Sequence, residues 1–272
     1  MILANPLANP LGNPLDLPRV SGVAKAIRGE ASWTVPGTYQ FIVPAGVKSI
    51  CGVAIGGGGG GPYLSSYGGG GGSLGWANNI AVSPGQTITI VVGNYGSANP
   101  VTVGGDSYIS LDGGLTKAVN APGGRINGNA NVAPTPNGGI GGIGGAGQWA
   151  GGGGTGGYLS AGGKGGGQSG GVLGAGSSDG GAGGSYNSYS GGGVGGGAWL
   201  YGSIAQGNLA GAAVTADTGG GVSDGFPPSR TGLNFNMFWG GGGGWQGPGS
   251  GAVRILWGDG RAFPATDVGI PQ

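Results

Sequence analysis

The residues that usually perform enzymatic chemistry are few in this chain and widely separated. It has no histidine and a single cysteine, so neither a histidine-based catalytic triad nor a zinc site of the usual type can form. Its nine acidic residues never stand side by side, whereas glycoside hydrolysis needs two carboxylates at a fixed separation. Glycine-rich matches to nucleotide-binding motifs are uninformative here, because none follows a strand and opens a helix. We therefore expect no enzymatic activity, no catalytic residue, no metal site and no cofactor.

The one cysteine, Cys51, lies in the apolar run Ser49-Ile50-Cys51-Gly52-Val53-Ala54-Ile55. Free cysteine in such surroundings behaves as a small hydrophobic side chain, so we expect it to be buried rather than reactive. A single cysteine also excludes an internal disulfide framework.

Aromatic side chains are the other candidates for chemistry, in this case the chemistry of recognition. Tyrosine and tryptophan occur with serine and asparagine in short segments between glycine runs, a composition typical of binding loops in which rigid rings supply contact area. The candidate contact residues are Tyr63, Tyr67, Trp149, Tyr158, Tyr186, Tyr189, Trp199 and Tyr201. The same rings could instead lie over the glycine runs as their apolar cover, and the sequence leaves both interpretations open.

The glycine runs that separate these segments have a local period of three. Glycine accounts for 79 of the 272 residues, and Gly138-Gly139-Ile140 is followed by two more Gly-Gly-X triplets. Three residues per turn is the period of the left-handed extended helix, which has no internal hydrogen bonds. Glycine loses the most conformational freedom on ordering, so such runs can order only when many of them pack together on a scaffold. The sequence predicts packed polyglycine-II-like extended helices, with flexible loops as the alternative.

Runs of β-branched and aromatic residues between turn dipeptides predict the scaffold. The expected strands are at 32–35, 39–43, 47–55, 76–82, 86–92, 105–111 and 251–257. We expect 76–82 and 86–92 to pair as a hairpin around Ser83-Pro84-Gly85, and the last strand to return from the end of the chain to close the fold. The pattern predicts a mainly β protein, with a small antiparallel β-sandwich and no significant α-helix.

The N-terminal residues form a separate segment with an Asn-Pro-Leu repeat. Proline at every fourth position excludes a regular helix, and the regularly placed leucines suit docking against a partner. The candidate anchoring residues are Pro6, Leu7, Pro10, Leu11, Pro14 and Leu15; a frayed terminus is the alternative. We expect an extended anchoring arm at 1–30, a β-sandwich at 31–112 with a glycine-rich insertion at 56–72, a glycine-rich region with aromatic loops at 113–249, and a closing strand and tail at 250–272.

Charge and hydropathy restrict the partners. The net charge is +1 and the ten basic residues are scattered, so a nucleic-acid partner is not expected. No apolar stretch approaches the length of a membrane span, and the N-terminus lacks the pattern of a secretion signal. We expect no membrane insertion, and synthesis in a cytoplasm followed by delivery through assembly.

The order of these motifs along the chain resembles a known family. The motifs are Trp33-Thr34-Val35-Pro36-Gly37, Trp76 to Gln86, Gly104 to Tyr108, Gly154 to Tyr158, and Gly249 to Gly258 followed by Arg261 to Pro264. Over residues 31–265 they resemble the glycine-rich domain of tailed-bacteriophage tail proteins. The composition is also similar to that of the tail-fibre tip adhesins of T-even-type phages, although the N-terminal arm and the β segment do not match those adhesins.

The resemblance implies a virion structural protein, either a tail-fibre or a tail-tip adhesin that binds the host cell surface. Its partners would be a host cell-surface glycan or outer-membrane protein, and other virion proteins through the N-terminal arm. It would be located on the exposed surface of the particle, after synthesis in the host cytoplasm, and a homotrimer is expected by analogy with fibres. The alternative is a non-adhesive architectural protein, such as a head fibre, a decoration protein or a tail-tip plug.

Overall fold

The structure is a computed structural model that describes residues 28–61, 67–167, 179–181, 183, 195–202, 237–238 and 248–264. Within these ranges the chain is mainly β and contains no α-helix, as the sequence predicts. The strands are β1 (Gly29–Trp33), β2 (Gly37–Ile42), β3 (Ser49–Ile55), β4 (Leu74–Ala81), β5 (Thr87–Val92), β6 (Ser107–Ser110), β7 (Lys117–Ala121), β8 (Asn137–Gly139), β9 (Ala198–Trp199), β10 (Met237–Phe238) and β11 (Ala252–Trp257). The six candidate anchoring residues, from Pro6 to Leu15, lie outside the described residues.

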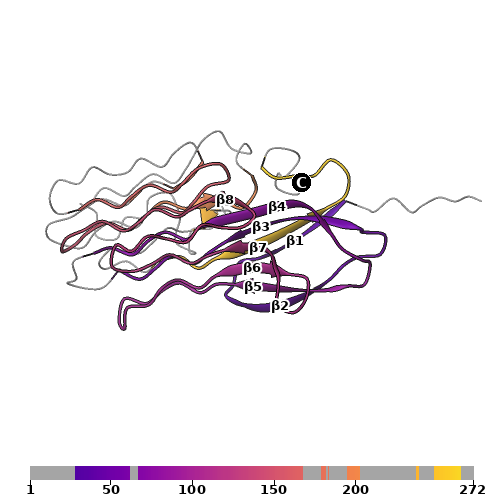
Figure 1. The fold of residues 1–272 in the computed structure, drawn as a ribbon, viewed down its shortest axis with the longest axis horizontal. Coiled ribbons are helices and arrows are strands. Elements are labelled where there is room, and N and C mark those ends of the chain that lie inside the picture. Colours follow the sequence, from indigo (N-terminus) through magenta and orange to yellow (C-terminus); the bar gives the residue numbers. More distant parts are fainter. Residues whose placement is uncertain are drawn as a thin grey trace, which may run out of the picture.

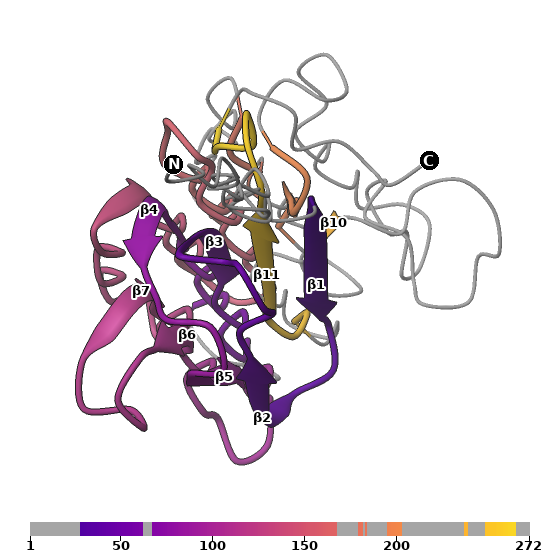
Figure 2. The ribbon, with the colours of Figure 1, turned by 90° about the vertical axis from the view of Figure 1, so that its right-hand side faces the viewer.

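The strands form two principal antiparallel sheets, which Figure 2 shows from the right-hand side of Figure 1. One has the order β1-β11-β3-β4-β8 and the other β2-β5-β6-β7, while β9 and β10 form a separate pair. The C-terminal strand β11 lies between β1 and β3, with Val253 opposite both Trp33 and Ala54. The expected return of the last strand to close the fold is therefore confirmed.

The expected hairpin around Ser83-Pro84-Gly85 is wrong, although the turn itself is present. The amide of Gln86 donates to the carbonyl of Ser83 at 3.0 Å, and Gly85 adopts a φ of 79°, which glycine tolerates. The strands on either side belong to different sheets, however, because β4 pairs with β3 and β5 pairs with β2. The turn therefore carries the chain from one sheet to the other.

The sequence predicts none of the four strands β7, β8, β9 and β10, of which β9 and β10 are two residues long. β7 has the mixed sequence Lys-Ala-Val-Asn-Ala, and β8 is Asn-Gly-Gly, which has poor intrinsic β propensity. β8 is a strand because its backbone pairs with β4, where Gly138 lies opposite Gly75. A Cβ on Gly138 would overlap the carbonyl of Leu74, so the close approach itself requires glycine.

The hydrophobic core consists of two clusters on opposite faces of the five-stranded sheet. The first combines residues of both sheets, among them Ile50 and Ile80 from one and Ile88 and Ile109 from the other. The second contains Val53, Ile55, Leu74 and Leu256 together with Tyr158, Leu200 and Phe263. β3 contributes to both clusters, which explains why Ile50–Ile55 reads as an unbroken apolar run and why Cys51 is buried as expected.

Glycine-rich segments extend from one end of the sheets, on the left in Figure 1. The chain leaves β3, β5, β7 and β8 at this end and returns after each excursion. We call the segments 56–61, 68–72, 122–126, 139–145, 151–157 and 162–167 the glycine block. Backbone bonds join the block to the sheet ends, for example from Ser73 N, directly before β4, to Pro122 O at 2.9 Å.

Candidate functional site

Hydrogen bonds within the glycine block recur at every third residue. Along 139–145, the amides of Gly139, Gly142 and Gly145 donate to the carbonyls of Gly157, Gly154 and Gly151 at 2.8, 2.7 and 2.9 Å. The amides between these three positions donate no hydrogen bond to segment 151–157. Strands of a β-sheet differ, because their backbone groups alternate between neighbours with a period of two.

Segment 151–157 bonds to neighbours in more than one direction. Besides accepting from 139–145, it donates from Gly151 and Gly154 to the carbonyls of Gly166 and Gly163. Between these positions, the amides of Gly153 and Gly156 donate to Gly69 and Gly72, each at 2.9 Å. The backbone of this segment is thereby satisfied by three segments of the block and, at Thr155, by Gly181 and Gly196, whereas a strand inside a sheet bonds to two flanking strands.

Close packing explains why so many positions in the block are glycine. A Cβ on Gly142 would overlap the carbonyl oxygen of Gly163, and one on Gly153 would overlap that of Gly142. A Cβ on Gly71 would meet the carbonyl of Gly154 in the same way. These contacts are made by backbone atoms, which cannot rotate aside.

A buried asparagine side chain ties three segments of the block together. Asn131 is only 7% exposed, and its Nδ2 donates to the carbonyls of Gly71, Gly141 and Gly142 at 2.8–3.1 Å. Its Oδ1 accepts from the amide of Arg125 at 2.7 Å. No sequence pattern indicates this role, since an isolated asparagine in a glycine-rich region is typical of a turn.

Three tight loops cap the block at the end opposite Arg28. We call the described loops 97–102, 126–129 and 146–150 the distal loops, and they join the outgoing and returning parts of the excursions that follow β5, β7 and β8. Arg28 lies at the other end of the molecule, because Gly29 pairs with Trp257, where β11 ends away from the block. The molecule therefore has two distinct ends, one at the start of β1 and one at the distal loops.

Each distal loop is held by its own hydrogen bonds. The amide of Thr102 donates to the carbonyl of Ser97 at 3.0 Å, and the amide of Ser97 donates to Thr102 Oγ1 at 2.7 Å. The amide of Asn129 donates to Ile126 O at 3.1 Å. In the third loop, the amide of Ala150 donates to the carbonyl of Gly147 at 3.2 Å.

The structure brings two of the candidate aromatic residues to this end. Tyr67 is 39% exposed, its backbone pairs with Ala146, and a Cβ on Gly128 would meet its ring. Trp149 is half-buried in the third loop and has a φ of 64°, an unusual value for a bulky residue. Two separate distal loops are thus linked through Tyr67.

The other aromatic candidates do not reach this end or are not described. Tyr158 is 2% exposed and belongs to the second core cluster, so it is withdrawn as a surface contact. Tyr201 is half-buried beside the same cluster. The remaining candidates, Tyr63, Tyr186, Tyr189 and the side chain of Trp199, lie outside the described residues.

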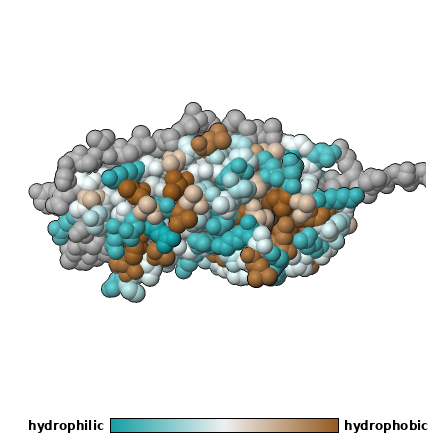
Figure 3. All heavy atoms as spheres, viewed as in Figure 1, coloured by the Kyte–Doolittle hydropathy of each residue, from teal (hydrophilic) through white to brown (hydrophobic). Residues whose placement is uncertain are grey.

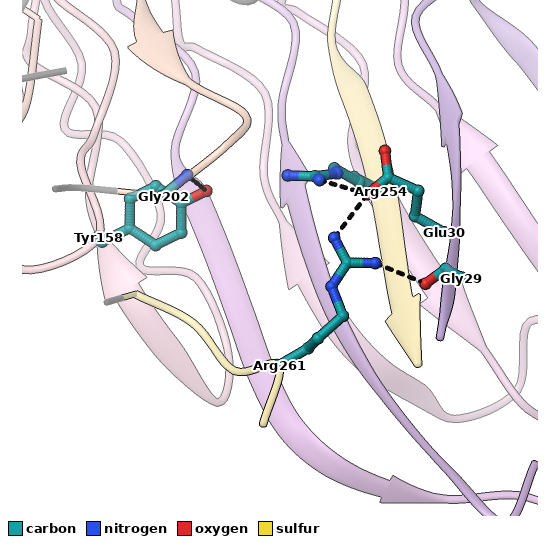
Figure 4. A network of polar contacts seen from close by, with 6 residues as sticks. All are labelled: Gly29, Glu30, Tyr158, Gly202, Arg254 and Arg261. Atoms are coloured by element: carbon teal, nitrogen blue, oxygen red, sulfur yellow. Dashed lines mark hydrogen bonds and ion pairs between the residues drawn. The ribbon is translucent and has the colours of Figure 1, made fainter. Parts of the chain in front are cut away.

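A largely buried charged network joins the first strand to the last (Figure 4). The fully buried Arg254 donates to Glu30 Oε2 at 2.7 Å, and Arg261 donates to the same oxygen at 2.6 Å. The Arg254 guanidinium lies 4.0 Å from the centre of the Tyr201 ring. The network is structural: it neutralises a buried cation and fixes β1 against β11.

Tyr158 is fixed by several contacts at once. Its hydroxyl accepts a hydrogen bond from the amide of Gly202 at 3.1 Å, and its ring stacks on Phe263 with centroids 5.7 Å apart. Burial raises the pKa of this phenol well above its ordinary value. It therefore remains neutral at physiological pH.

Titratable and metal-ligating side chains are sparse among the described residues. No group of three or more histidine, cysteine, aspartate and glutamate side chains is placed to hold a metal ion in this part of the chain. Burial raises the pKa of the Cys51 thiol, which donates to the carbonyl of Arg261 at 3.2 Å. Across the same ranges, no helix is long and apolar enough to cross a membrane.

The surface facing the viewer in Figure 3 is mixed in polarity. Apolar side chains form several separate groups among polar ones, over the sheets and over the glycine block. Exposed apolar residues near the block include Tyr95, Val103 and Val132. Scattered exposure of this kind is normal for a protein surface and does not define an interface by itself.

Comparison with known proteins gives no family for this chain. A scan against protein-family models finds no match, and a search of curated proteins finds no significant relative.

Proposed function

We propose that the chain is a virion structural protein of a tailed bacteriophage, acting as a tail-fibre or tail-tip adhesin that binds the host cell surface. The observation that supports this most is the separation of its two ends. Arg28, which follows the Asn-Pro-Leu arm in sequence, lies at one end, and the distal loops lie at the other. Such a molecule can be attached at one end and present a surface at the other.

The proposal includes a packed lattice of polyglycine-II-like helices as the rigid part between these ends. Support comes from the three-residue period of the hydrogen bonds and from the several directions in which segment 151–157 bonds. Flexible loops would leave these amides to water and would leave room for a Cβ, which Gly142 and Gly153 lack. Packing and hydrogen bonding in the lattice would also offset the large conformational entropy that so many glycines lose on ordering.

We further propose that the two principal sheets form a β-sandwich that serves as the base of this lattice. The first hydrophobic cluster draws residues from both sheets, which is the arrangement expected of a sandwich core. Trp33 on β1 and Phe41 on β2 stack edge to face with centroids 5.8 Å apart, closing one side between the sheets.

The phage assignment itself rests on the ordered motifs described above, which resemble the glycine-rich domain of phage tail proteins. Under this proposal, the N-terminal arm binds other virion proteins through Pro6, Leu7, Pro10, Leu11, Pro14 and Leu15. The host partner is a surface glycan or an outer-membrane protein, and the assembled form is a homotrimer by analogy with fibres. The protein would be made in the host cytoplasm and incorporated into the particle.

Deleting the gene from the phage that encodes the chain tests the proposal. Adhesin function predicts that particles lacking the chain still assemble but adsorb to host cells at a strongly reduced rate, and that added wild-type chain restores adsorption. Antibodies raised against the chain should label intact particles. Normal adsorption with defective assembly would favour the architectural alternative, and absence of label from the particles would contradict both.

A further inference from the structure

The distal loops expose a particular combination of side chains, namely aromatic rings beside carboxamides. Asn127 and Gln148 are exposed, and Tyr67 and Trp149 lie in or against the same two loops. Asn99 is exposed in the first distal loop. A carboxamide both donates and accepts hydrogen bonds, and an aromatic face is electron-rich, so it attracts weakly positive C–H bonds.

Charge is nearly absent from the described residues at this end of the molecule. Among the described residues of the distal loops and Tyr67, none is acidic, and Arg125, next to the second loop, is the neighbouring cation. A surface selected for a strongly charged partner would present complementary charges. This one presents hydrogen-bonding groups that suit hydroxyls.

The backbone of these loops is set before any ligand arrives. Asn127 and Gly128 have φ values of 58° and 67°, the left-handed pair that a tight two-residue turn requires. Loops already held in one conformation lose little entropy on binding, so weak polar contacts can give useful affinity.

Position 149 has a left-handed backbone conformation that is unfavourable for a bulky side chain such as tryptophan. A bulky side chain at a φ of 64° is strained, and glycine or asparagine would fit the position better. Strain of this kind tends to be retained where a side chain is needed for function. The indole of Trp149 contributes little to the core clusters, to which it does not belong.

We propose that Tyr67, Asn127, Gln148 and Trp149 form a binding surface for an uncharged saccharide of the host envelope. The rings take the C–H face of a sugar, and the carboxamides bond its hydroxyls. This inference rests on the proposed adhesin function and narrows its partner from glycan or protein to neutral glycan.

Binding of the fluorescently labelled full-length chain to host cells tests the inference. Periodate oxidation of the cell-surface sugars should abolish binding, whereas protease treatment of the cells should not. The polysaccharide released from those cells by mild acid should bind the chain, with little change between low and high salt, because few charges are involved. Trp149→Asn and Gln148→Ala should each weaken binding at least tenfold.

Matched variants separate binding from folding. Trp149→Gly relieves the backbone strain, so it should keep or raise the melting temperature while losing binding. Leu115→Ala, a change at a 90% exposed side chain in the turn between β6 and β7, should bind like the wild type.

The outcomes distinguish the inference from the proposed function. Binding that survives periodate and is lost with protease would overturn the saccharide and leave the adhesin. Unchanged binding by Trp149→Gly and Gln148→Ala would overturn this surface. A wild-type chain that does not bind untreated host cells would overturn the adhesin itself.

Discussion

At the scale of single residues, many glycines of this protein are required by contact rather than by backbone conformation. Gly142 and Gly153 lie where a carbonyl oxygen of a neighbouring segment occupies the space of a Cβ. Gly113 is the opposite case, with a φ of 77° and open space around it. The two kinds of glycine should respond differently to substitution.

Gly142→Ala should destabilise the protein by about 2 kcal/mol or more, because backbone must move to accept the methyl group. Gly113→Ala should cost about 1 kcal/mol, since only the left-handed conformation opposes it. Urea unfolding of both variants beside the wild type measures the difference. Equal costs would contradict the close packing of the block.

Tyr158 should make stability sensitive to alkaline pH. Its pKa is raised in the folded state. The contribution of the buried phenol to the free energy of unfolding is therefore complete below the pKa of tyrosine in the unfolded chain, about 10, and is lost as pH rises above that pKa. Tyr158→Phe should lower stability by about 1 kcal/mol at pH 7, because the amide of Gly202 loses its acceptor. Above pH 10 the free energy of unfolding of the variant should fall less steeply than that of the wild type, with slopes that differ by up to about 1.4 kcal/mol per pH unit. Parallel pH profiles would contradict its burial.

At the scale of elements, the first and last described strands depend on each other. β11 lies between β1 and β3, and Arg254 at its centre is fully buried against Glu30 of β1. Removing one partner of a buried pair leaves an uncompensated charge, which is more costly than losing both. The network should therefore show strong coupling between distant parts of the sequence.

Glu30→Ala should destabilise the protein by about 3 kcal/mol, because Arg254 and Arg261 both lose their carboxylate. The double variant Glu30→Ala with Arg254→Met should recover part of that loss. Guanidinium unfolding of the wild type, both single variants and the double variant completes the cycle. Additive effects would show that the pair is not coupled.

The sequence predicts elements best where local pattern and final environment agree. The β-branched runs at β3 and β5 and the closing strand β11 were found at nearly the right residues. β8 was missed because pairing with β4, rather than its own residues, makes it a strand. The hairpin failed because a turn signal fixes a change of direction but not the sheet in which the chain continues.

The sequence predicts the candidate surface only in part, because local composition does not determine which segments pack against each other. Tyr67 and Trp149 were singled out by composition and lie at the distal end. Tyr158 has the same local context of glycine and serine, yet it fills the second core cluster. Local composition identifies aromatic loops but cannot say which of them pack back onto the sheet.

At the scale of the whole molecule, the proposed role of the distal loops depends on an ordered glycine block. The block is the part of the chain that joins these loops to the sheets. The described part of the block has no α-helix, and its cohesion comes from hydrogen bonds that recur at every third residue between neighbouring segments. Asn131 strengthens this cohesion from within. If the block is rigid, the distal loops are held at a fixed position relative to β1.

Amide hydrogen exchange of the full-length protein, read by mass spectrometry for peptides within 139–157, tests this claim most directly. The account predicts that the amides of Gly142, Gly145, Gly151 and Gly154 are protected to an extent comparable with β3, since all four are bonded within the block. Exchange at the rate of an unstructured peptide, while β3 stays protected, would contradict it.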